Sequence, residues 1–358
     1  MSRINDWRKE MTIGAGATLG AANRQLSGTQ SEILVVVDSN DRFIGALSER
    51  SVRRAMLAGL AEDASIIALT DPGHAISENA ISYENVNVII ELADGKPTLI
   101  RSTQAEPVRD NLIVLMVGGE GTRLRPLTDH CPKPLLPVQG KPLLEITLER
   151  LRSFGYKNFC MTLGYRGDMI VNHFGDGTRF GVNIEYVHER EALGTCGALR
   201  LLQQKPTAPL LVMNGDVITG INFDKLFSFH TQSQSAATMC AYRFDVQLSY
   251  GVLTAEGDTL GSLLEKPTSS HWINAGIYVL NPDAIDLIPP GRFDMPTLFQ
   301  QVKTQGGRAS LYAMREQWID IGTVEEYERA NHTMDIIPEL GPVALPSTLT
   351  NAVTSFAP

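Results

Sequence analysis

From residue 110 onward, short apolar runs alternate with segments whose apolar residues recur every three or four positions. Short apolar runs between turn residues are typical of buried strands, and the longer repeat is typical of amphipathic helices. Leu144, Leu148 and Leu151 fall on one helical face, and Gly155 follows, which predicts a helix that ends there. The pattern predicts strands over residues 112–117, 158–163, 182–187 and 209–213, and helices over residues 142–154, 168–174 and 196–204.

This alternation predicts an α/β fold with a Rossmann-like, mostly parallel sheet and helices on both faces. Ligands of such sheets bind at the carboxyl ends of the strands. Residues 112–117 (LIVLMV) lead directly into a glycine cluster, and residues 209–213 lead into Asn-Gly-Asp, which ends at Asp216. We therefore expect the glycine cluster and Asp216 to face the same crevice.

The first 109 residues have their own pattern and form what we call the front section. Strands are expected over residues 32–37 (EILVVV) and 43–47, a strand and helix within 12–25, and a helix over 49–57. A chain of 358 residues is long for a single core, so two domains are expected. We divide it into a small α+β front section (1–109), a main section (110–335) and a tail (336–358) rich in Pro, Thr, Ser and Ala.

Composition narrows the class of protein. The apolar fraction of 43% and the charged fraction of 20% are typical of globular proteins in water. The net charge of -9, without a long basic run, argues against nucleic acid or an anionic membrane as the main partner. No apolar stretch approaches the length of a membrane span, and the N-terminal residues MSRINDWRKEM lack a signal-peptide core. The four cysteines are widely spaced, which predicts free thiols and a cytoplasmic location.

The segment 115–135 (LMVGGEGTRLRPLTDHCPKPL) holds the parts of a polyphosphate site. Gly118, Gly119 and Gly121 allow a sharp turn and a close approach of backbone N–H groups to a ligand. Arg123 presents a fork of donors that matches phosphate oxygens, and Lys133 lies in a loop stiffened by two prolines. A strand end, a glycine turn and convergent cations together favour phosphate binding over a plain turn.

Two common glycine motifs are excluded. A dinucleotide fingerprint would require a third glycine where Leu124 stands. A Walker loop built on Gly140-Lys141 would require glycine at Leu135 and a hydroxyl residue at Pro142.

The segment GGEGTRLRPLTDHCPKPLLPVQGKPLL resembles the signature loop of the sugar-1-phosphate nucleotidyltransferases, also called sugar-nucleotide pyrophosphorylases. Other segments match that family in order across nearly all of the main section, namely GYRGDMIVNHFGDGTRFGVNIEYVHEREALGTCGAL, MNGDV, YGVL, EKP, INAGIYVL and WIDIGT. The resemblance implies transfer of a nucleoside monophosphate from a nucleoside triphosphate to a sugar-1-phosphate, with release of pyrophosphate.

That reaction explains the residue types. The nucleophile is a phosphate oxygen with a second pKa near ~6, so no general base is required. The site must bring two polyanions together and stabilise the leaving pyrophosphate, and Mg²⁺ prefers carboxylate and phosphate oxygens. The resemblance implies that Asp216 and Asp320 hold Mg²⁺, that Arg123 holds the leaving phosphates, and that Lys133 contacts the α-phosphate.

The resemblance also implies the binding residues. The nucleotide would be held by Gly118, Gly119, Gly121, Thr122, Glu189, Gly194 and Thr195, with Glu189 at a purine edge. The sugar-1-phosphate would be held by Gly251, Glu265, Lys266 and Asn274. Taken singly, three of these positions have structural alternatives, because Asp216 suits a turn, Glu265-Lys266 a solvated strand end, and Asp320 a helix cap.

Residues 33–59 (ILVVVDSNDRFIGALSERSVRRAMLAG) resemble one unit of a CBS module, and a second, truncated unit starts near Asp71. Ser51 stands where nucleotide-binding CBS units carry a ribose-binding Asp, which disfavours adenosine nucleotides here. We expect the front section to bury apolar surface against a second copy or its own main section, and the protein to be a homo-oligomer. A chain that begins near Pro107 should then keep catalysis but lose oligomer mass.

A CBS-like front section on this main section resembles guanylyltransferases of bacterial surface-glycan and nonulosonate pathways, which act on mannose- or amino-sugar-1-phosphates. GTP and such a sugar phosphate are the substrates that this resemblance implies. The alternatives are a catalytically weak regulatory homologue and a binding module whose CBS-like section gates a pathway. Joint retention of Arg123, Lys133, Asp216 and Asp320 favours the enzyme.

Overall fold

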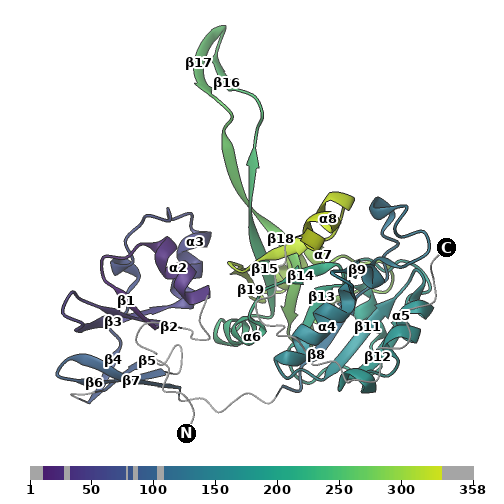
Figure 1. The fold of residues 1–358 in the computed structure, drawn as a ribbon, viewed down its shortest axis with the longest axis horizontal. Coiled ribbons are helices and arrows are strands. Elements are labelled where there is room, and N and C mark those ends of the chain that lie inside the picture. Colours follow the sequence, from purple (N-terminus) through teal and green to yellow (C-terminus); the bar gives the residue numbers. More distant parts are fainter. Residues whose placement is uncertain (1–10, 28–32, 78–79, 84–87, 103–108, 333–358) are drawn as a thin grey trace.

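The computed structural model describes residues 11–27, 33–77, 80–83, 88–102 and 109–332, and the expected tail lies outside these residues. Figure 1 shows the front section beside the larger main section, from which a long two-stranded arm projects. Within the described residues, every helix is too short or too polar to cross a bilayer.

The main section is built on one seven-stranded sheet, in the order β12-β11-β8-β13-β18-β15-β19. All neighbours are parallel except the two pairs that β18 makes, so one strand runs against six. The mostly parallel α/β sheet predicted from the sequence is therefore confirmed. Its strands are β8 (Leu112–Met116), β11 (Asn158–Leu163), β12 (Asn183–His188), β13 (Leu210–Asn214), β15 (Ala237–Gln247), β18 (Thr268–Leu280) and β19 (Ala309–Ala313).

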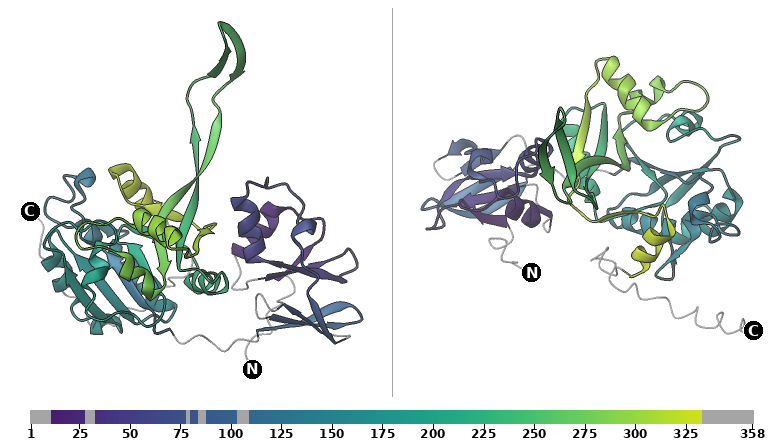
Figure 2. Two further views of the ribbon diagram at one scale, coloured as in Figure 1. Left: turned by 180° about the vertical axis from the view of Figure 1, so that it is seen from behind. Right: turned by 90° about the horizontal axis from the view of Figure 1, so that it is seen from above.

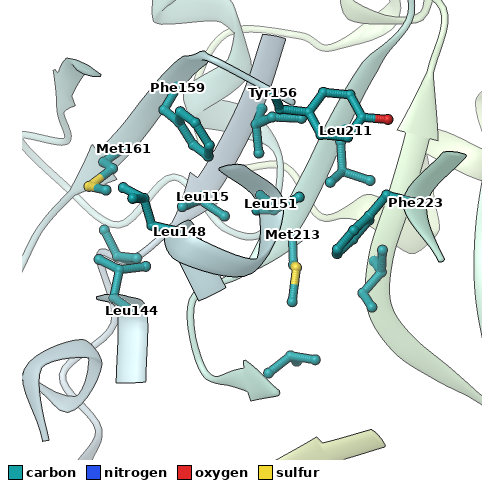
Figure 3. Close-up of a cluster of buried hydrophobic side chains, with 14 of the residues drawn as sticks. Leu115, Leu144, Leu148, Leu151, Tyr156, Phe159, Met161, Leu211, Met213 and Phe223 are labelled. Atoms are coloured by element: carbon teal, nitrogen blue, oxygen red, sulfur yellow. The ribbon is translucent and has the colours of Figure 1, made fainter. Parts of the chain in front are cut away.

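Helices cover both faces of this sheet, which explains why its strands are apolar runs rather than alternating ones. Leu148 and Leu151 of α4 pack with Leu115 and Leu211 of the sheet on one face (Figure 3). On the other face, Val114 belongs to a separate buried cluster that includes residues of α7. The helices are α4 (Leu143–Ser153), α5 (Gly167–Phe174), α6 (Phe223–Gln232), α7 (Met295–Thr304) and α8 (Val324–His332).

The helix expected over residues 196–204 is shorter than predicted, because only Gly197–Leu201 are helical, and they form a 3₁₀ helix. The N–H groups of Cys196 and Gly197 both donate to the carbonyl of Phe293, each at 3.1 Å. A Cβ on Gly197 would lie 2.7 Å from the carbonyl oxygen of Gly291. Close docking against residues 291–293 thus overrides the apolar pattern that suggested a regular helix.

The front section begins with a strand–helix–strand–strand–helix unit, as predicted. Its strands form a sheet in the order β1-β2-β3, with β1 and β2 parallel. The elements are β1 (Thr12–Gly14), α2 (Leu19–Ser27), β2 (Ile33–Val37), β3 (Phe43–Ser48) and α3 (Glu49–Leu57). The likeness of this unit to a CBS module stays a prediction.

The second part of the front section is an antiparallel sheet. Where a truncated CBS-like unit was expected, the described residues form strands only, in the order β4-β5-β6-β7. Tyr83 and Ile90 pack against the free face of β2, so the two small sheets share a core. The strands are β4 (His74–Ser77), β5 (Ala80–Tyr83), β6 (Val88–Ala93) and β7 (Lys96–Ser102).

The front section docks on its own main section through α3. The guanidinium of Arg53 lies 3.5 Å from the centre of the Tyr312 ring and donates to the carbonyl of Ala313. Glu49 lies 3.2 Å from the ammonium of Lys225 and 2.5 Å from the guanidinium of Arg315. These charged side chains are almost fully buried. The front section therefore packs against its own main section, which is one of the two partners expected from the sequence.

The arm consists of residues 244–271 and projects away from both sections (Figures 1 and 2). Strands β15 and β18 leave the sheet still paired, in register from Ala241 opposite Asn274 to Gln247 opposite Thr268. Beyond them, β16 (Val252–Glu256) and β17 (Thr259–Leu264) pair antiparallel at the tip.

Candidate active site

The glycine loop follows β8 as predicted and is held close to its neighbours. Gly121 has a φ of 64°, a left-handed conformation that favours glycine, and its carbonyl accepts a bond of 2.9 Å from the Thr128 hydroxyl. A Cβ on Gly118 would lie 3.0 Å from Oε1 of Glu189. A Cβ on Gly119 would meet nothing within 4 Å, so the loop backbone is open there to a ligand.

Lys133 and Asp216 meet at the base of the loop. Lys133 opens the 3₁₀ helix Lys133–Leu135 after Pro132, and Asp216 follows β13. The Lys133 ammonium lies 2.6 Å from Oδ2 of Asp216, with the lysine side chain 10% exposed. The two sequence motifs, 83 residues apart, therefore share one side of the cleft as predicted.

Asp320 is brought beside Asp216 by two short strands. Val217 of β14 (Val217–Thr219) pairs with Asp320 of β20 (Trp318–Asp320), and the Ile321 N–H donates to the Asp216 carbonyl at 3.0 Å. Burial, and then the nearby Asp216 carboxylate, raise the pKa of Asp320 to about 6. Two neighbouring, half-buried carboxyl groups ionise together only when a positive charge lies close to them.

These two carboxyl groups fit a divalent cation. Oδ1 of Asp216 and Oδ1 of Asp320 are both buried, and both lack a hydrogen-bond partner. Such unpaired buried oxygens are costly unless a donor or a cation reaches them. No group of three or more His, Cys, Asp or Glu residues with a metal-site arrangement occurs among the described residues. A pair of carboxylates is the donor set that suits Mg²⁺, whose other ligands are water and phosphate oxygens.

Arg123 lies on the same side. A Cβ on Gly322 would be 3.3 Å from both terminal nitrogens of Arg123, so the absence of a side chain at Gly322 leaves room for the guanidinium. Arg123 is exposed within the cleft, where its fork of donors is available to an anion.

Another part of the cleft wall is formed by the loop after β12. Oε2 of Glu189 accepts from the Leu193 N–H at 2.9 Å. Gly194 has a φ of 77°, and a Cβ there would lie 2.6 Å from Oδ1 of Asp294. The Thr195 N–H donates to the same oxygen at 3.0 Å, and the Thr195 hydroxyl accepts from the Met295 N–H at 2.7 Å.

Asp294 was missed by the sequence reasoning. It precedes α7, whose second residue is proline, so the residue type and spacing mark a helix start. No local signal shows that its carboxylate would hold a loop 99 residues away.

One cleft of about 790 Å³ unites ten of the predicted residues. They are Gly118, Gly119, Gly121, Thr122, Arg123, Lys133, Glu189, Gly194, Thr195 and Asp216. Tyr165 and Asn214 also line the cleft and were not predicted.

The four predicted sugar residues lie outside the cleft, and Asn274 is separated along the arm from the other three. Asn274 lies at the root of the arm, where its amide donates to the Tyr278 hydroxyl at 2.8 Å. Gly251, Glu265 and Lys266 lie near the tip of the arm, are exposed, and do not line the cleft.

Comparisons with known proteins agree with this architecture. The profile of the nucleotidyl transferase family matches residues 112–335. A mannose-1-phosphate guanyltransferase of Yarrowia lipolytica is 35% identical over 226 residues, which are 60% of this chain and 61% of the relative. A mannose-1-phosphate guanylyltransferase of Mycobacterium tuberculosis is 35% identical over 236 residues, 64% of this chain and 65% of the relative. The chain thus spans less than two thirds of the length of these relatives.

A solved structure gives a similar result for the fold. HddC from Yersinia pseudotuberculosis superimposes with a TM-score of 0.50 at 26% identity, over 62% of this chain and 98% of that chain. The sheet order defines an α/β protein whose cleft lies beside a glycine loop and a pair of carboxylates. The family match covers more than half of the chain, and the protein belongs to the nucleotidyl transferase family.

Proposed function

We propose that this protein transfers a nucleoside monophosphate from a nucleoside triphosphate to a sugar-1-phosphate, giving a nucleotide-sugar and pyrophosphate. The observation that carries the proposal is the ion pair of Lys133 and Asp216 in the cleft beside the glycine loop, with Asp320 held next to Asp216. The named relatives, both mannose-1-phosphate guanylyltransferases, support the same reaction.

The chain's own residues supply positioning and charge. An oxygen of the sugar phosphate attacks the α-phosphorus, and the bond to the bridging oxygen of pyrophosphate breaks. The Lys133 ammonium reaches the α-phosphate oxygens, and the Arg123 guanidinium holds the β- and γ-phosphates as negative charge moves onto them. Asp216 and Asp320 would hold Mg²⁺, which would supply positive charge near the transferred phosphate.

The remaining residues would bind the two substrates. The backbone of Gly118, Gly119 and Gly121 cradles the triphosphate, and Glu189 reaches a purine edge beside Gly194 and Thr195. Because both named relatives are guanylyltransferases, we propose GTP as the donor. A mannose- or amino-sugar-1-phosphate is the proposed acceptor, for bacterial surface-glycan or nonulosonate synthesis.

A panel of GTP, ATP, UTP, CTP and dTTP against mannose-, glucose- and amino-sugar-1-phosphates tests this proposal. Pyrophosphate release is followed with Mg²⁺ and with excess chelator. We expect turnover with GTP and one of the proposed acceptors, and none with chelator. Absence of turnover with every pair would favour the alternative, a regulatory homologue that binds nucleotide without using it.

A further inference from the structure

The arm carries residues that the proposed reaction needs, and these residues lie outside the cleft. Gly251 and Glu265 are neighbours there, since a Cβ on Gly251 would lie 3.0 Å from Oε2 of Glu265. Lys266 follows with a φ of 44°, a constrained backbone that fixes the direction of the strand end. The three residues thus form one group near the tip, and this group is exposed.

The arm does not bring this group to the cleft of its own chain. Lys266 and Asn274 are joined by about eight residues of extended chain, which span roughly 26 Å. The ladder between β15 and β18 is continuous over that stretch, from Ala241 opposite Asn274 to Gln247 opposite Thr268. Folding the arm back onto its own cleft would therefore break backbone hydrogen bonds along both strands.

The arm also exposes many large apolar side chains, which is unusual for a ribbon surrounded by water. A two-stranded ribbon alone is marginally stable, and its edges offer unpaired backbone groups. Tyr250 is 81% exposed, and Leu253 and Leu263, which lie opposite each other, are 63% and 56% exposed. The exposed large apolar residues of the arm are Phe244, Val246, Leu248, Tyr250, Leu253, Leu260, Leu263 and Leu264.

This surface is large enough to hold two chains together. At roughly 100 Å² of exposed area for each of these side chains, two arms present on the order of 1,500 Å², which matches a standard protein interface. Exposed large apolar side chains gathered on one projecting segment of a chain mark an interaction site.

We propose that two copies of this chain exchange their arms, so that Glu265 and Lys266 of one copy complete the sugar-phosphate subsite in the cleft of the other. Exchange keeps the strand ladder intact and needs only a second identical chain. It follows that the catalytic site is shared between two chains, and that a single chain lacks part of its acceptor site. This inference rests on the proposed function.

Complementation between two inactive variants tests the exchange. One variant is Asp216→Asn, a change in the cleft, and the other is Glu265→Ala with Lys266→Ala, a change on the arm. Co-expressed with two different tags and purified through both, they form a dimer with one chain of each. In an exchanged dimer one site combines the unaltered cleft with the unaltered arm, so about half of the wild-type rate per dimer returns.

A reciprocal pairing is the matched control. All three substitutions are placed in one chain, which is paired with a wild-type chain. Exchange then puts a lesion in both sites, and we expect turnover at the level of the single variants. If each arm served its own cleft, the first pairing would be inactive and the reciprocal one half active, which would overturn the proposal. An arm variant as active as wild type would overturn it too.

The mass of the protein gives a second readout. We expect light scattering to show a dimer for wild type and a monomer for Leu253→Ser with Leu263→Ser, whose exposed positions should tolerate serine. Asp258→Asn, in the turn of the tip, should leave the dimer intact. A monomeric wild type would refute the exchange. A wild type inactive with every substrate pair would refute the proposed function alone, and the mass measurement would then decide the exchange.

Discussion

At the scale of single residues, two carboxyl groups lie close together in and beside the cleft. Their negative charges repel each other unless a cation or another ligand is bound. Asp216 and Asp320 each have a buried oxygen without a hydrogen-bond partner, and the Lys133 ammonium lies 2.6 Å from the other carboxylate oxygen of Asp216. Burial of both carboxyl groups is tolerable when phosphates and a metal ion complete the site. The local chemistry therefore favours ligand binding over a purely structural role for these residues.

We expect Asp216→Asn and Asp320→Asn each to lower kcat by about 100-fold or more, because each removes one charge from the metal site. The rate is measured over a range of Mg²⁺ concentrations. Asp283→Asn is the control, since this carboxylate is 94% exposed and pairs only with Lys205 in the described structure. Near-normal rates in both cleft variants at low Mg²⁺ would refute the metal assignment.

Arg123→Ala should depress kcat more than it weakens nucleotide binding, because charge builds up on pyrophosphate mainly in the transition state. Arg125→Ala is the matched control, an exposed arginine on the same loop that lies near Glu120 and Asp129. Steady-state kinetics with varied nucleoside triphosphate separate the two constants. A change confined to KM would mean that Arg123 holds only the ground state.

At the scale of elements, helix α3 joins the front section to the main section through buried charges. Arg53 contacts Glu49 on its own helix and Glu316 across the contact, at 2.5 Å and 3.3 Å. Glu316 lies four residues before Asp320 on the same segment, so the docked helix supports the strand that carries a proposed metal ligand.

Arg53→Ala should destabilise the protein by about 3–5 kcal/mol, because it leaves Glu49 and Glu316 buried with less compensation. Arg54→Ala, an exposed change on the same helix, should fall within about 0.5 kcal/mol of wild type. Denaturant unfolding gives the free energies, and hydrogen exchange of α3 reports whether the helix stays docked. Equal losses in the two variants would contradict a role for the buried network.

The same contact gives a dependence on pH. Burial raises the pKa of Glu49, but the nearby cations Arg53, Arg315 and Lys225 more than offset this and lower it from 4.5 to about 2. The ionised carboxylate therefore stabilises the fold fully above about pH 4.5, and this contribution is lost as the pH falls towards 2. We expect the difference in free energy of unfolding between wild type and Glu49→Gln to shrink over that window. A difference that does not change with pH would contradict this account.

How far the sequence predicted these features depends on the distance between partners along the chain. The glycine loop, Lys133 and Asp216 follow from strand ends and turn residues, and parallel strands bring their carboxyl ends together. Contacts such as Arg53 with Tyr312, 259 residues apart, have no local pattern. The helix within residues 196–204 was predicted too long for the same reason, since its conformation depends on a contact with Phe293.

At the scale of the whole molecule, two surfaces could unite copies of the chain. The sequence suggested the front section, but the structure gives α3 a partner in its own main section. The arm, by contrast, leaves the body of the molecule with a large apolar surface exposed (Figures 1 and 2). Glu265 and Lys266 were expected in the site because their motif matched, yet the sequence did not reveal that their strands extend beyond the sheet.

A chain that begins at Pro107 distinguishes the two surfaces. Without the front section, Tyr312, Arg315 and Glu316 are exposed to water. Their polar and charged groups are then solvated rather than left buried without partners. We therefore expect this chain to fold, to keep much of its turnover, and to keep the mass of a dimer by light scattering, because the arms remain. The sequence predicted that this chain would lose oligomer mass. If it does, the dimer contact lies in the front section and not in the arm. A folded but inactive chain would mean that docking of α3 is required to hold Asp320 in place.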